Sequence, residues 1–114
     1  MRIALLISVV IVGGVAQLPL SAQARMCIDD VERYNDLGHA AFERAVNDEQ
    51  KHRDPCRDLK EAIQLHSKAV QLGKNPQCSV GLPQPEEFRA GVRDMEAELQ
   101  IDIKSARGDR CIAN

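Results

Sequence analysis

Two histidines, His39 and His66, are the side chains of this chain best suited by type and placement to chemistry. Imidazole nitrogens bind transition metals and titrate near neutral pH, so two facing histidines can hold a metal ion or form a pH-sensitive contact. If the stretches that carry them pack as antiparallel helices, the two rings face each other or a shared groove. A purely structural interpretation places His66 at the edge of the core and His39 in solvent.

The four cysteines favour a structural role over a chemical one. No two of them form a Cys-x-x-Cys pair, which argues against a redox site. They are Cys27, Cys56, Cys78 and Cys111. His52 lies four residues before Cys56, but no second pair of zinc ligands accompanies it. The absence of Cys-x-x-Cys-His excludes c-type haem by motif, while b-type haem stays open. We therefore assign no metal ligand and no cofactor.

Acidic side chains are dense in the stretch 85–107. They alternate with Arg89, Arg93 and Lys104, which predicts a solvated helix face with ion pairs between neighbouring turns. Acid–base catalysis would need a pocket that separates two carboxyl pKa values. No phosphate-binding glycine loop or Gly-x-Ser-x-Gly motif is present, so we expect no enzyme activity and no catalytic residue. The acidic residues are Glu86, Glu87, Asp94, Glu96, Glu98 and Asp102.

The stretch 56–73 has the strongest helical pattern. It follows Asp54-Pro55, which suits a helix start, and it ends at Gly73, which suits a helix end. Apolar residues recur at three- and four-residue spacing, which indicates one buried helix face that also contains His66. The apolar positions are Leu59, Ala62, Ile63, Ala69, Val70 and Gly73.

The same spacing predicts two further helices, over about 28–50 and 85–107, with a loop over 74–84 between the second and third helices. No segment has the alternation of a strand. We therefore predict an all-α fold, a small three-helix bundle in up-down-up order, as a single domain over residues 25–114.

An even number of cysteines in a short exported chain predicts two disulfides. In an up-down-up bundle, Cys27 and Cys78 lie at one end and Cys56 and Cys111 at the other. Any other pairing would span a helix roughly 30 Å long, far beyond the ~4.4–6.8 Å between the Cα atoms of a disulfide. We expect Cys27–Cys78 and Cys56–Cys111.

Residues 1–24 have the pattern of a signal peptide. Arg2 precedes an apolar run over 3–12, and Ala22-Gln23-Ala24 resembles a cleavage site. The run is shorter than the ~20 residues of a membrane-spanning helix, so we expect no stable membrane anchor after cleavage. The predicted location is periplasmic or secreted.

Residues 34–72 resemble one helical hairpin of the tetratricopeptide repeat family. Residues 34–42, Tyr-Asn-Asp-Leu-Gly-His-Ala-Ala-Phe, are similar to the first helix of the repeat, and Ala62 and Ala69 stand at the small positions of the second. His66 occupies a position that is usually aromatic in that family. The spacing between Gly38 and Ala62 is about twice that of the family, and only one unit is present. The resemblance implies binding of a protein partner through helix surfaces and supplies no binding residue.

The composition narrows the function further. The chain has 15 Lys and Arg against 17 Asp and Glu, without a basic block, so we expect no nucleic-acid binding. We predict an exported helical module that binds an unidentified protein partner or has a structural role. The alternatives are a periplasmic acid-stress chaperone and a metal- or haem-binding helical bundle.

Overall fold

The computed structural model describes residues 22–113. They form four helices and no strand, α2 (Ala22–Gln50), α3 (Cys56–Gly73), α4 (Pro76–Ser79) and α5 (Pro85–Gly108), which confirms the all-α class. Most of the predicted signal peptide, residues 1–21, lies outside the described part of the chain. No helix over 22–113 is long and apolar enough to cross a membrane.

The short helix α4 was not predicted, since the stretch 74–84 was expected to be a loop. The side chain of Asn75 accepts a hydrogen bond from the backbone N–H of Gln77. Pro76 occupies the first turn, where the backbone N–H that proline lacks would have no partner within the helix. The prediction of three helices was therefore incomplete, because this capping pattern spans too few residues to produce a helical repeat.

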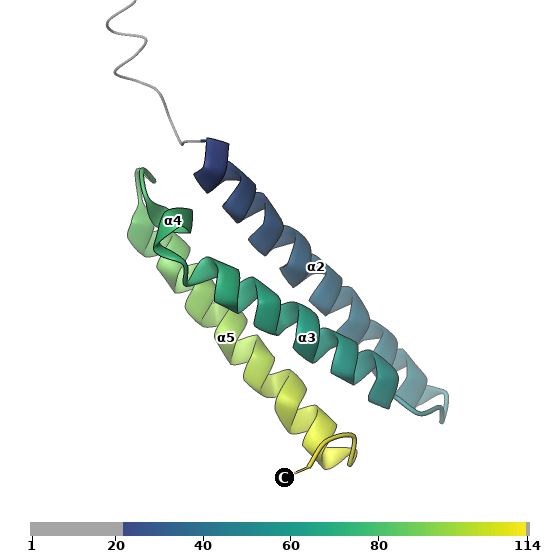
Figure 1. Cartoon of the computed structure of the whole chain (residues 1–114). Coiled ribbons are helices and arrows are strands. Elements are labelled where there is room, and N and C mark those ends of the chain that lie inside the picture. The colour runs from purple at the N-terminus through teal and green to yellow at the C-terminus, as the bar shows by residue number, and fades with distance from the viewer. Residues whose placement is uncertain (1–21, 114) are drawn as a thin grey trace, which may run out of the picture.

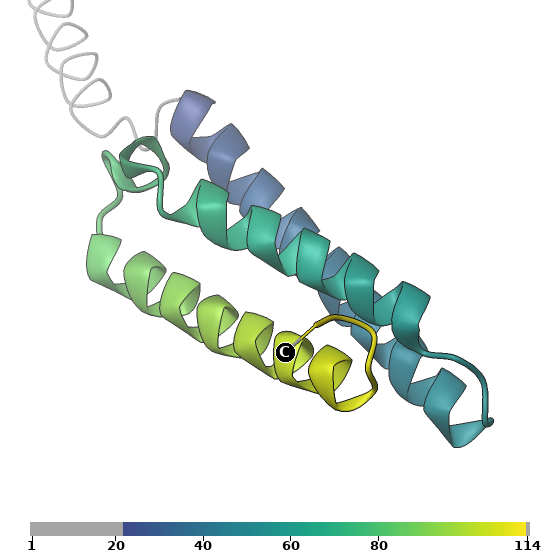
Figure 2. The same cartoon turned by 60° about the horizontal axis from the view of Figure 1, so that its bottom comes forward.

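The helix α3 lies between the other two long helices and packs against both (Figures 1 and 2). Its predicted apolar face is confirmed at five positions, with Ile63 partly buried. Small side chains of α2 allow this helix to approach α3 closely. Two of them, Ala41 and Ala45, are each at most 1% exposed. The buried positions of α3 are Leu59, Ala62, His66, Ala69, Val70 and Gly73.

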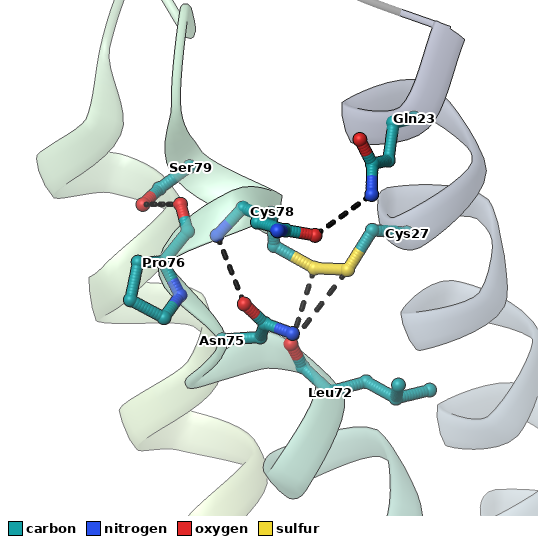
Figure 3. The surroundings of a disulfide bond; sticks show 8 residues. Gln23, Cys27, Leu72, Asn75, Pro76, Cys78 and Ser79 are labelled. Atoms are coloured by element: carbon teal, nitrogen blue, oxygen red, sulfur yellow. Dashed lines mark hydrogen bonds between the residues drawn. A yellow bond between two sulfur atoms is a disulfide. The ribbon is translucent and has the colours of Figure 1, made fainter.

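Disulfides join Cys27 to Cys78 and Cys56 to Cys111, the two pairs expected from the sequence. Their Cα atoms are 5.3 Å and 5.1 Å apart. Figure 3 shows the first bond beside the carbonyl oxygen of Leu72, which is 3.1 Å from Cys78 Sγ. Disulfides of this kind fit an oxidising compartment.

Residues 22–27 are already helical, so the first helix extends further toward the N-terminus than the predicted 28–50 and Cys27 lies inside α2. The added turns are covered by α4, which places Gln77 Oε1 2.8 Å from Gln23 Nε2 (Figure 3). Ala24 is 1% exposed. Burial against a neighbouring helix extends a helix beyond what its own sequence pattern indicates.

Candidate functional site

The two predicted histidines meet at the middle of the fold. His39 of α2 and His66 of α3 have ring centroids 5.1 Å apart and an interplanar angle of 76°. Glu98 of α5 reaches both, with Oε2 3.0 Å from His39 Nε2 and 3.8 Å from His66 Nε2. Three helices, far apart in sequence, therefore bring these side chains to one point.

The imidazole of His66 is held by a fourth side chain. Its Nδ1 atom forms a hydrogen bond with Oδ2 of Asp102, and the exposed fractions of the two side chains are 1% and 4%. Glu98 and Asp102 are four residues apart, so they share one face of α5. The helical spacing of α5 thus places the Asp102 carboxylate beside Nδ1 of His66 and the Glu98 carboxylate on the side of Nε2.

The close approach of α2 to α3 depends on Gly38, the residue before His39. A Cβ atom at this position would collide with the His66 ring, with Cγ at 2.9 Å. Glycine is therefore required here by contact, since any larger residue would push the imidazole away from α2.

The protonation of His66 follows from its partners. Because Nδ1 lies against a carboxylate, the proton of the neutral ring belongs on Nδ1, which leaves a lone pair on Nε2. Buried polar atoms almost always have a partner, yet His66 Nε2 and Glu98 Oε2 have no well-aligned hydrogen bond. His39 Nε2 lies between two polar groups, 3.3 Å from the side-chain amide nitrogen of Asn35 and 3.0 Å from Glu98 Oε2.

These three atoms, His39 Nε2, His66 Nε2 and Glu98 Oε2, form what we call the three-donor cluster. One ligand atom from each of the three residues lies within 4.8 Å of the other two. Bonds of about 2.0–2.2 Å around a tetrahedral zinc ion would place its ligand atoms about 3.3–3.6 Å apart. The separations of 3.0 and 3.8 Å from Glu98 bracket that range.

The electrostatics of the cluster centre on His66. The hydrogen bond that His66 donates to Asp102 raises the pKa of His66 above its ordinary value, and burial opposes this effect. The charges of Asp102 and Glu98 and the backbone of Asn35 raise the pKa further. The surroundings of this ring therefore favour positive charge, whether supplied by a proton or by a cation.

A pocket of about 240 Å³ opens beside the three-donor cluster. Its walls include the partly buried Phe42 of α2 and Ile101 of α5, which is 55% exposed. The remaining lining residues are His39, His66, Glu98 and Asp102. The cluster is thus accessible from solvent through an opening with apolar sides.

Two of the four residues at this site were misassigned from the sequence. Asp102 was expected on a solvated helix face, yet it is 2% exposed, and Glu98 turns its buried Oε2 toward the histidines. A signal existed, because Asp102 falls between Leu99 and Ala106 at the spacing of the apolar stripe. His66 is also more deeply buried than a residue at the edge of the core.

The other candidate residues do not join this site. Cys56 is disulfide-bonded, so it cannot form a zinc pair with His52. Glu86 and Glu96 form exposed ion pairs with Arg89 and Lys74, as expected for a solvated face. Comparisons of the chain with protein-family models, with curated proteins and with solved structures find no match.

Proposed function

We propose that the protein binds one divalent transition-metal ion through His39, His66 and Glu98, with Asp102 orienting His66 from behind. The observation that carries the proposal is the convergence of three potential ligand atoms from three helices, one of them the buried Nε2 of His66, which has no aligned hydrogen bond. Histidine ligands commonly donate a hydrogen bond from their second ring nitrogen to a carboxylate, which fixes the orientation of the ring and increases its basicity.

The donor set favours some metals over others. Two imidazoles and one carboxylate suit zinc, iron, cobalt, nickel and copper, whereas magnesium and calcium prefer sites built from oxygen alone. The pocket of about 240 Å³ is smaller than the roughly 300–1,000 Å³ of sites for larger organic ligands. These features support a single ion over haem. We place this function in an exported, up-down-up helical unit, in line with the two disulfides and the predicted signal peptide.

Zinc titration calorimetry on the disulfide-bonded protein, stripped of metal with a chelator, tests the proposal. We expect one ion per chain, and His39→Ala and Glu98→Gln each to weaken binding by at least about tenfold. His39 and Glu98 are partly exposed, so both variants should fold. The matched control is His52→Asn, an exposed histidine outside the site, where asparagine suits the positive φ of 57°. Absence of binding, or equal binding by all variants, would refute the proposal.

Binding of a protein partner is a second candidate, which the resemblance of residues 34–72 to a tetratricopeptide-type hairpin also suggests. Apolar side chains that α2 and α5 leave exposed favour it, since such side chains are enriched where proteins meet. They are Leu37, Val46 and Ile101, with exposed fractions of 47%, 39% and 55%. Affinity capture from the extracytoplasmic fraction should identify a partner that Leu37→Lys no longer retains and that unaltered protein retains.

A further inference from the structure

We infer that the metal ion proposed above keeps one coordination position open, and that this position takes a small carboxylate with an apolar end. This inference rests on the proposed function. It adds the class of ligand that the site receives, and it comes from the arrangement of the cluster relative to its pocket.

The number of protein ligands is the first argument. Within residues 22–113, the group of converging donor atoms contains His39, His66 and Glu98 and no fourth member. Asp102 cannot complete it, because its carboxylate is bonded to Nδ1 on the opposite side of the His66 ring. Structural zinc sites use four protein ligands, whereas sites with three leave the fourth position to water or another ligand.

The direction of the open position is the second argument. His66 lies at the closed side of the cluster with 1% of its side chain exposed, while the side chains of His39 and Glu98 are 45% and 41% exposed. The same three residues line the pocket. A fourth ligand therefore approaches from the pocket, on the side away from α3.

The charge and the walls of the pocket define the ligand. A divalent ion with one bound carboxylate and two neutral imidazoles keeps a net positive charge at the ion itself, which favours an anionic fourth ligand. The charge of Asp102 offsets this only in part, because its carboxylate lies behind the His66 ring, away from the open position. Phe42 and Ile101 flank the approach and give the part of the ligand beyond its donor atom an apolar surface. A pocket of about 240 Å³ suits a small ligand.

The test uses the complete disulfide-bonded protein loaded with Co²⁺, whose visible absorption reports changes in coordination. Acetate and butyrate are titrated separately, with methylammonium as the cationic control. We expect saturable spectral changes with both carboxylates, none with methylammonium, and binding about fourfold tighter for each methylene that becomes buried. Ile101→Gln should bind Co²⁺ normally, because residue 101 is not a metal ligand. It should lose most of the preference for butyrate over acetate, because the apolar wall formed by Ile101 is removed.

The outcomes separate the two proposals. If the protein gives no Co²⁺ spectrum, the metal-binding function itself fails. If Co²⁺ binds with the spectrum of a bound ion but carboxylates leave that spectrum unchanged, the open position is refuted while the metal site stands. Equal affinity for acetate and butyrate would overturn the apolar end of the ligand.

Discussion

The Nδ1 atom of His66 and the Oδ2 atom of Asp102 are hydrogen-bonded in the core, joining α3 to α5. Both residues are at most 2% exposed, so neither side chain can exchange its partner for water without local opening. This pair fixes the rotation of the His66 ring and, through it, the direction of Nε2 toward His39 and Glu98. It therefore links the packing of the helices to the geometry of the three-donor cluster.

Replacement of Asp102 by asparagine should affect both stability and metal binding. Asp102→Asn weakens the buried hydrogen bond, so we expect the free energy of unfolding to fall by about 1–3 kcal/mol in urea denaturation with chelator present. Zinc affinity should fall by about 10–100-fold, as for other outer-shell carboxylates. Asp94→Asn, at an exposed position of the same helix, is the control and should change stability by less than about 0.5 kcal/mol. Equal effects of the two variants would contradict the assigned role.

The stability of the metal-free protein should depend on pH through His66. The folded state raises the pKa of His66 above its ordinary value of 6.5, so protonation favours folding. This contribution is fully present below pH 6.5 and is lost as the pH rises through the folded-state pKa. In urea denaturation above pH 5.5, the stability difference between the unaltered protein and Asp102→Asn should shrink as the pH rises. A difference that stays constant or grows would show that Asp102 does not raise this pKa.

Two glycine-to-alanine substitutions should have opposite effects. Gly38→Ala places a methyl group into the His66 ring, and we expect a loss of about 1–3 kcal/mol in stability together with weaker zinc binding. Gly91→Ala, in α5, meets no atom within 4 Å and should raise stability by up to about 1 kcal/mol, because alanine favours the helix. Thermal unfolding and zinc titration of both variants provide the comparison. Equal stability of the two variants would rule out the close packing of His66 on α2.

The two disulfides should supply much of the stability of so small a domain. They link residues 51 and 55 positions apart, and loops of this size are worth roughly 4 kcal/mol each in the chain-entropy account. We expect the double variant Cys56→Ser with Cys111→Ser to unfold at much lower urea concentration than the unaltered protein. Mass spectrometry of a non-reducing digest checks the pairing, and a Cys27–Cys56 peptide would contradict it.

Local pattern was sufficient for the helix α3. Its buried face follows from residues three and four positions apart, and its bounds match the predicted 56–73. Gly73 does not take the left-handed conformation expected of a closing glycine; it lies where a Cβ atom would be 2.7 Å from Val92 Cγ2. The disulfide pairs also followed from the sequence, because helices of the predicted lengths allow only cysteines at the same end to meet. For α2, in contrast, the sequence underestimated the length, since contact with α4 stabilises turns that carry no strong pattern of their own.

The helical class, the buried face of α3 and the candidate pair His39 and His66 all follow from residue types and their spacing. The recruitment of Glu98 and Asp102 to this pair does not. The partner of a charged side chain depends on how α5 is rotated and positioned against α3, which local periodicity does not specify. An acidic residue on a helix has the same local pattern whether it meets water or a buried imidazole, and the packed neighbour determines which of the two it becomes.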